Sequence, residues 1–237
     1  SFFNATGTIA NGANYFSTIN SSNTQGLVGT DYTNAIRLLS NKDDYQFNII
    51  VAPGLTYANT TTQLDSIVSL AESRGDCIAV IDLVNYGSTL AGATTKALSL
   101  NTSYGASYWP WVQMRSATGR NEWCPASVVI PGVYAFTDAA AAPWFAPAGL
   151  VRGGIPGVIQ TERRLSKSDR DNLYAGKVNP IATFPGTGIS IMGQKTLQSK
   201  ASALDRVNVR RLLIDLKKFI GDQARTLVFE QNTISTR

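Results

Sequence analysis

The stretch Cys77-Ile-Ala-Val-Ile-Asp-Leu83 decides how the middle of the chain folds, because its near-continuous apolar run is typical of a strand buried on both faces. Upstream, apolar residues recur at helix spacing over 59–74, and Gly75 follows as a candidate C-cap. Before that helix, Phe47-Asn-Ile-Ile-Val-Ala52 predicts another buried strand, which stops at Pro53-Gly54. The predicted order is therefore strand, helix, strand.

The alternation continues downstream of this unit. Residues 88–98 predict a weaker helix, and 106–114 predict a further strand in which Pro110 indicates an edge or a bulge. Residues 124–142 predict a helix with Pro125 in its first turn. Strands that alternate with helices, and that are apolar along their length, predict a parallel α/β layer.

The regular alternation ends after Trp144. Short strands are predicted over 158–161, 181–184, 189–193 and 226–230. A helix begins within 166–173, with Ser166 or Ser168 as its cap. The clearest helix spans 204–224, and its apolar side chains form one arc: Val209, Leu212, Leu213, Leu216, Phe219 and Ile220.

Composition excludes the commonest catalytic chemistry. The chain of 237 residues contains no histidine, so it lacks the usual general base and the usual metal ligand. Its two cysteines, Cys77 and Cys124, have no metal-binding spacing and are expected to be reduced thiols. No apolar run approaches the roughly 20 residues that span a bilayer. We therefore expect no enzyme, no cofactor, no metal and no membrane insertion.

Partial matches to enzyme motifs leave an alternative open. It is a histidine-free α/β enzyme domain that binds a nucleotide or small molecule. Glycines near Lys195 and in 51–54 resemble phosphate loops only loosely, because the spacing is wrong. Gly87-Ser88 lacks the full nucleophile elbow. Asp82 ends a strand without a second carboxylate, so we interpret it as a loop-capping carboxylate.

Charge is distributed unevenly along the chain. Residues 1–149 carry 6 Lys and Arg against 9 Asp and Glu, whereas 150–237 carry 15 against 7. Such asymmetry indicates a partner, either an acidic protein surface or nucleic acid, or else a solvated basic face. No RNP-like aromatic motif or recognition-helix pattern accompanies the basic residues, and an acidic protein surface would explain them equally well. A nucleic-acid-binding protein stays a third alternative.

The last third of the chain carries an ordered series of Gly, Pro and Arg clusters. They are Trp144-Phe-Ala-Pro-Ala-Gly149, Arg152-Gly153, Val178-Asn-Pro-Ile181, Gly186-Thr-Gly188, Gly193-Gln-Lys-Thr-Leu197, Val207-Asn-Val-Arg-Arg211 and Phe229-Glu-Gln-Asn232. This order resembles the C-terminal core of contractile tail sheath proteins of myophages and related injection systems, those of T-even-type phages above all. The resemblance covers the last hundred residues or so and extends loosely back to Asn121.

The resemblance implies an α/β (α+β) fold of mixed sheet layers flanked by helices, within a multi-domain sheath-type architecture. We expect residues 1–45 to end a variable, outward-facing domain and 46–147 to form the α/β core. Residues 148–237 would be the conserved C-terminal portion. The start at Ser1 without an initiator Met and the end at Arg237 suggest a fragment that lacks its natural termini.

The resemblance also implies a function. Sheath subunits polymerise as stacked hexameric rings around a tail tube and contract to drive the tube through the host envelope for genome ejection. Implied partners are other copies of the chain, the tail tube protein, and baseplate and tail terminator proteins, with no direct nucleic acid. The implied location is the tail of the virion, with assembly in the host cytoplasm.

Basic residues of the C-terminal part are the candidate contacts to the tube or to neighbouring subunits. They are Arg163, Arg164, Lys167, Arg170, Arg206, Arg210, Arg211, Lys217 and Lys218. Contacts that must break during contraction suit polar, charge-complementary surfaces better than large apolar ones. On this basis, reversing the charge of Arg210 and Arg211 should impair assembly and leave the fold intact.

Overall fold

The computed structural model describes residues 28–231 and 233, so the first 27 residues of the expected 1–45 segment lie outside it. A five-stranded sheet with the order β1-β2-β3-β7-β8 forms the centre. Its strands are β1 (Ile49–Thr56), β2 (Ile78–Asp82), β3 (Gly105–Trp109), β7 (Asn179–Phe184) and β8 (Gly188–Ile191). The pairs from β1 to β7 are parallel, and β8 is antiparallel to β7, which makes the sheet mixed, as expected.

A smaller antiparallel sheet has the order β5-β4-β6. Its strands are β4 (Val112–Arg115), β5 (Asn121–Cys124) and β6 (Val158–Thr161). The single strand predicted over 106–114 was therefore wrong: the chain leaves the large sheet after Trp109 and enters the small one at Val112. Proline cannot donate a ladder hydrogen bond, so Pro110 lies between the two strands instead of inside one.

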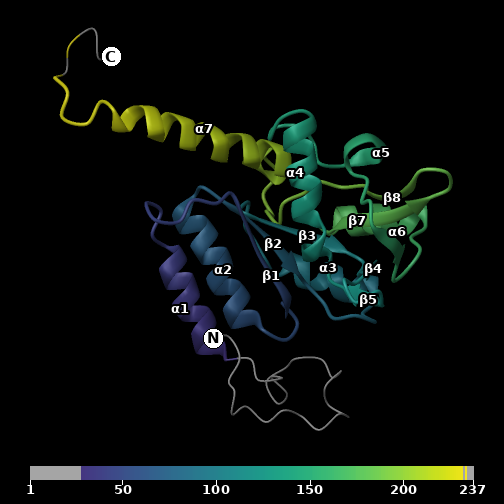
Figure 1. Cartoon of the computed structure of the whole chain (residues 1–237). Helices are drawn as coiled ribbons and strands as arrows, with labels where there is room; N and C mark the ends of the chain where they lie inside the picture. Colours follow the sequence, from purple (N-terminus) through teal and green to yellow (C-terminus); the bar gives the residue numbers. More distant parts are fainter. Residues whose placement is uncertain (1–27, 232, 234–237) are drawn as a thin grey trace.

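Helices cover both faces of the large sheet (Figure 1). The described helices are α1 (Gly29–Leu39), α2 (Thr61–Arg74), α3 (Leu90–Leu98), α4 (Ile130–Ala140), α5 (Gly149–Arg152), α6 (Lys167–Ala175) and α7 (Val207–Arg225), with short 3-10 turns η1 (Ala126–Val128) and η2 (Ala203–Asp205). Along β2, Ala79 and Ile81 pack into the core under α2 and α3, whereas Ile78 and Val80 pack into the core under α4. This alternation confirms that β2 is buried on both faces.

Both sheets cross the boundary that we expected at residue 148. The large sheet joins β1 to β3 with β7 and β8, and the small sheet joins β4 and β5 with β6. Each hydrophobic core also takes residues from both sides of that position. The structure therefore places no domain boundary there, and 46–147 fold together with the residues that follow.

Local signals at helix ends are confirmed. Gly75 ends α2 with φ 69°, and its N–H donates to the carbonyl of Ala71. Ser166, not Ser168, caps α6: its hydroxyl accepts from the N–H of Asp169, and the Asp169 carboxylate accepts from the N–H of Ser166.

Other predicted boundaries were wrong. The helix predicted over 124–142 is β5, η1 and α4 in succession. The strand predicted at 226–230 consists of turns beyond α7. β1 does not stop at Pro53-Gly54 but continues to Thr56 across a shift in register. Of the helices that the structure describes, none is both long and apolar enough to cross a membrane.

Candidate subunit interface

The basic residues predicted as interface contacts do not form one patch. Arg163, Arg164 and Lys167 are exposed between β6 and the first turn of α6. Arg170 on α6 is half-buried, with its guanidinium 5.2 Å from the centre of the Phe184 ring. The α7 helix extends from one side of the molecule, and α6 lies on the opposite side (Figure 1). The cations of α6 are therefore separated from those of α7.

Arg210 and Arg211 in the second turn of α7 lie inside the subunit, only 6% and 4% exposed. Arg211 makes a two-pronged ion pair with Asp138 of α4, with Nη1 2.8 Å from Oδ1, and its guanidinium stacks on Tyr134. Arg210 stacks on Tyr104 at 4.0 Å and donates to the Ser103 hydroxyl.

These contacts correct one expectation. A charge reversal at Arg210 and Arg211 would break a buried ion pair and leave charges without partners, so it would not leave the fold intact. The two arginines hold α7 to the body and are not free to contact a neighbour in this conformation.

Arg206 is engaged at the start of α7. Its Nε lies 3.2 Å from the Asp205 carboxylate, and its guanidinium stacks on the Tyr174 ring. The Lys195 ammonium also lies over this ring, 4.4 Å from its centre. Lys217 and Lys218 are exposed and line a groove of about 690 Å³ under α7. The structure thus leaves Arg163, Arg164, Lys167, Lys217 and Lys218 as the exposed members of the predicted set.

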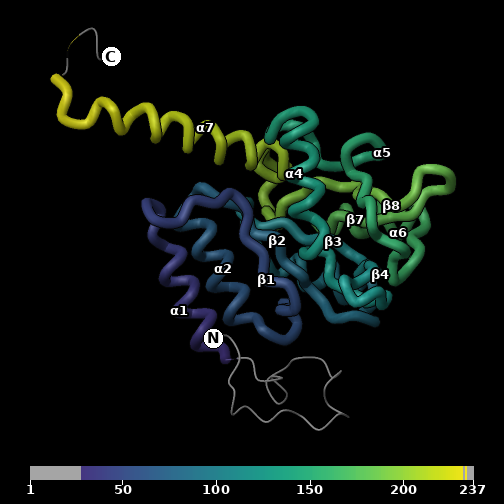
Figure 2. The backbone as a smooth tube through the Cα atoms, in the orientation of Figure 1, coloured from purple at the N-terminus to yellow at the C-terminus, as the bar shows by residue number. Residues whose placement is uncertain are grey.

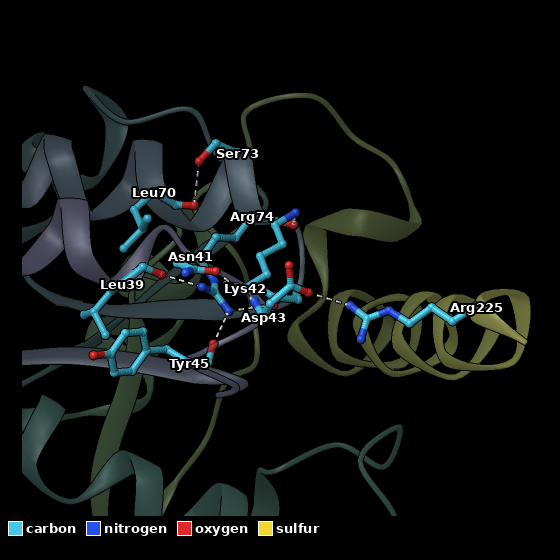
Figure 3. A network of polar contacts seen from close by, with 10 residues as sticks. Leu39, Asn41, Lys42, Asp43, Tyr45, Leu70, Ser73, Arg74 and Arg225 are labelled. Atoms are coloured by element: carbon cyan, nitrogen blue, oxygen red, sulfur yellow. Dashed lines mark hydrogen bonds and ion pairs between the residues drawn. The ribbon is translucent and has the colours of Figure 1, made fainter. Parts of the chain in front are cut away.

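Charged side chains lie on both walls of the groove. The α7 wall carries Asp215, Lys217, Lys218, Asp222 and Arg225, and the opposite wall is lined by Lys42, 46–48 and 74–76. At the far end of α7, Arg225 pairs with Asp43 across the groove at 2.9 Å (Figure 3). This pair is exposed on both sides, so it contributes little stability.

Arg74 fixes the wall opposite α7. Its guanidinium donates to the carbonyl oxygens of Leu39 and Tyr45 (Figure 3). It also pairs with Asp76 at 2.8 Å. The same group stacks on Phe47 at 4.3 Å. A single buried arginine therefore holds the segment after α1 in place beneath α7.

The apolar arc of α7 faces away from the groove and from the other residues that the structure describes. Leu213, Leu216, Phe219 and Ile220 are all exposed, and Phe219 and Ile220 reach 64% and 62%. We call these four residues the α7 stripe. An amphipathic helix ordinarily turns its apolar arc to the core. Here the buried side chains, Val207, Arg210, Arg211 and Ile214, lie on the opposite face.

The α7 helix also extends beyond the body that supports it. Its first turns contact α4 through the Arg211–Asp138 pair and the segment after α4 through the Asn208 amide, which donates to the carbonyl of Trp144. Its last turns point away from the sheets and from α5 (Figures 1 and 2). The result is a projecting helix with an uncovered apolar face, which is typical of a protein–protein contact.

Asp82, one of the enzyme-like positions, has a structural role. Asp82 is buried, and its carboxylate accepts hydrogen bonds from the N–H and the hydroxyl of Ser127, at 3.1 and 2.5 Å. This confirms it as a loop-capping carboxylate. Burial raises its pKa to about 7, although the Ser127 hydrogen bonds act in the opposite direction. Within the described part of the chain, no cluster of acidic and cysteine side chains could hold a metal ion.

Comparison with known proteins identifies the family. The family model described as the phage tail sheath protein central domain matches residues 8–197. The chain therefore belongs to the phage tail sheath family. The matched range confirms the resemblance found in the sequence but begins far before Asn121, and it ends before α7.

Two curated relatives are tail sheath proteins. That of Vibrio phage KVP40 is 32% identical over 233 residues, which cover 87% of this chain. That of Enterobacteria phage T4 is 29% identical over 242 residues, which cover 92% of this chain. The chain spans 35% and 36% of the length of these two relatives.

Solved structures confirm the fold. The contracted sheath complex of an extracellular contractile injection system matches with a TM-score of 0.70 at 25% identity, over 85% of this chain and 54% of that one. A chain in the baseplate of the anti-feeding prophage matches with a TM-score of 0.70 at 23% identity, over 89% of this chain and 55% of that one. The α/β sheath-type architecture expected from the sequence is thus observed.

Proposed function

We propose that this chain is part of a contractile tail sheath subunit, a structural protein that polymerises around a tail tube and contracts to drive the tube through the host cell envelope. Membership of the sheath family supports this function over the nucleotide- or small-molecule-binding alternative. Likeness to a sheath complex in its contracted state supports it further. In this proposal the chain is not an enzyme and inserts into no membrane.

The observation that carries the proposal is the α7 stripe. Burying an apolar side chain of this size contributes about 1.5–3 kcal/mol. Four such side chains on one helix face, left uncovered by the part of the chain that the structure describes, form a surface suited to a neighbouring copy. In a lattice of identical subunits the same contact would repeat at every position.

The exposed cations are proposed to supply the charge-complementary part of the contacts. Arg163, Arg164 and Lys167 lie near α6, and Lys217 and Lys218 lie along the groove. Exposed charge pairs steer association and are individually weak, so they can exchange during contraction. The proposed partners are other copies of the chain, the tail tube protein, and the baseplate and tail terminator proteins. The proposed location is the virion tail, after assembly in the host cytoplasm.

Electron microscopy of the purified protein, at its full natural length and concentrated without any tube, tests the proposal. A sheath protein should form striated hollow cylinders. Replacing Phe219 and Ile220 by serine should abolish the cylinders, because the stripe loses its two most exposed apolar side chains.

The matched control is Leu98→Ser on α3, which removes a similarly exposed apolar side chain, at 58%, from another part of the surface. Its cylinders should be indistinguishable from those of the parent. Dispersed particles of the parent protein under all salt conditions would contradict the proposed function. If the Phe219/Ile220 variant still formed cylinders, the α7 stripe would not be needed for assembly.

A further inference from the structure

The two halves of α7 are attached to the other elements in different ways. The buried side chains of the helix all lie in its first half, and they are Val207, Arg210, Arg211 and Ile214. Every residue from 215 to 225 is exposed. We call residues 215–225 the α7 strap. The first half of α7 is thus fixed by packing, whereas the strap has little buried surface to hold it.

Charged side chains make the contacts of the strap that the structure describes. Arg225 donates to the Asp43 carboxylate at 2.9 Å, and the two side chains are 62% and 80% exposed (Figure 3). Lys217 extends to the end of α2, where its ammonium lies 3.6 Å from the position that a Cβ atom of Gly75 would take. A cation at this end of a helix interacts favourably with the helix dipole. Both contacts are electrostatic and open to solvent, so dissolved ions weaken them.

The groove of about 690 Å³ beneath the strap gives the helix room to move. Gly221 lies on the wall of this groove, between the last buried side chain, Ile214, and the ion pair of Arg225. A glycine inside a helix loses more conformational entropy on folding than an alanine does, so it weakens the helix at this point. Beyond Gly221, the Arg225–Asp43 pair is the contact that holds the last turn of α7 over the groove.

We propose that the α7 strap is a salt-sensitive device with two positions. It is closed over the groove when Arg225 pairs with Asp43, and it opens when competing charges separate the pair, while the buried first half of α7 stays in place. Phe219 and Ile220 belong to the strap, so its position sets where the most exposed side chains of the α7 stripe lie. The device goes beyond the proposed function, since it is a property of the single chain.

Amide hydrogen exchange of the chain, followed by mass spectrometry, tests the strap. Asp43→Ala removes the carboxylate without changing the sequence of α7. At about 0.01 M salt, the amides of 219–225 should exchange faster in this variant than in the parent by a factor of about 1.5–5, the range that exposed ion pairs give. At about 1 M salt, where the Debye length falls to about 3 Å, the two proteins should exchange at nearly the same rate.

Asp44→Ala is the matched control, because Asp44 is the next exposed carboxylate in the chain and accepts from Asn41 instead of from α7. Its exchange in 219–225 should equal that of the parent. Arg225→Ala should behave as Asp43→Ala does, and the double variant should exchange no faster than either, since one change already removes the pair. The amides of β2 report global unfolding and should exchange alike in all of these proteins.

Each other outcome overturns the inference. Parent-like exchange of Asp43→Ala at low salt would show that the pair does not close the strap. Equal acceleration in Asp43→Ala and Asp44→Ala would assign the effect to net charge. An acceleration that persists at about 1 M salt, or that extends to 208–214 or to β2, would mean that the substitution loosens the whole helix or the whole fold instead of opening a strap.

Discussion

At the scale of single residues, Arg211 is the side chain on which the attachment of α7 depends. Its guanidinium is 4% exposed, stacks on Tyr134 and forms the ion pair with Asp138. Removing one partner of a buried pair costs about 3–5 kcal/mol. Arg211→Ala should therefore lower the free energy of unfolding by about 3 kcal/mol, because Asp138 itself is partly exposed.

Denaturant unfolding measures this loss. Lys218→Ala on the same helix is the matched control and should change the free energy of unfolding by less than about 0.5 kcal/mol, since Lys218 is exposed. Equal unfolding midpoints for the two variants would show that the Arg211–Asp138 pair does not secure α7.

The role of Arg211 could not be predicted from the sequence. An arginine on a helix is exposed in most proteins, and its partner Asp138 lies 73 positions earlier in the chain. Lys177 is a similar case: it is buried and donates to the carbonyl oxygens of Leu100 and Leu197. Both positions contribute to the cationic excess of residues 150–237 without adding to the exposed charge.

Asp82 gives the stability of the protein a pH dependence. Burial raises its pKa from 3.8 to about 7, so the native state holds a proton that the unfolded chain releases above about pH 4. The stabilising contribution is complete below pH 4 and is lost as the pH rises through 7. Each pKa unit corresponds to 1.36 kcal/mol, so the loss is on the order of 4 kcal/mol.

Asp82→Asn should remove this dependence, because the amide does not ionise. Its oxygen can still accept from the N–H of Ser127, and its NH2 group can donate to the Ser127 hydroxyl. Urea unfolding between pH 4 and pH 8 should show a falling free energy of unfolding for the parent and a flatter profile for the variant. Asp171→Asn, at an exposed carboxylate, should keep the parent's slope. A parent profile as flat as that of Asp82→Asn would contradict the assignment.

At the scale of elements, the capping box of α6 is a local interaction with a measurable effect. Ser166→Ala removes the hydroxyl that accepts from the N–H of Asp169, and such a loss costs about 1 kcal/mol. Ser168→Ala changes an exposed serine two positions further along, inside the helix. Thermal unfolding should show a lower Tm for Ser166→Ala, with Ser168→Ala close to the parent. The reverse order would place the cap at Ser168.

The α7 helix shows how far sequence patterns reach at this scale. Its length and its apolar arc were predicted closely, because helix periodicity is a property of the segment itself. The direction in which the arc faces was not, because it depends on Arg210, Arg211 and Ile214 finding partners on α4 and near β3. A helix whose apolar arc has no cover among the described residues is ambiguous in the sequence and becomes an interface candidate only in the structure.

Strand pairing was predictable only for neighbours in the sequence. The parallel unit of β1, α2 and β2 follows from the alternation of apolar runs and helix spacing. The pair of β3 with β7 joins Tyr108 to Asn179, and nothing in either segment specifies the other. The same holds for β6, which completes the small sheet beside β4. This is why the expected boundary at residue 148 has no counterpart in the structure.

At the scale of the whole molecule, the distribution of charge tests the proposed contacts. Part of the cationic excess is internal, at Lys177, Arg210 and Arg211, and Arg163 and Arg164 remain on the surface. Replacing both exposed arginines by glutamate should leave the free energy of unfolding within about 0.5 kcal/mol of the parent. It should slow assembly, because like charges then meet at the contact.

The matched control reverses two other exposed arginines, Arg115 and Arg120, which lie in and after β4. Light scattering should follow the assembly of both variants at low and high salt. Since salt screens exposed charges beyond about 10 Å at 0.1 M, the defect of the Arg163/Arg164 variant should shrink as salt rises. Equal defects in the two variants would indicate a general effect of net charge, and parent-like assembly of the Arg163/Arg164 variant would show that these arginines contact no neighbour.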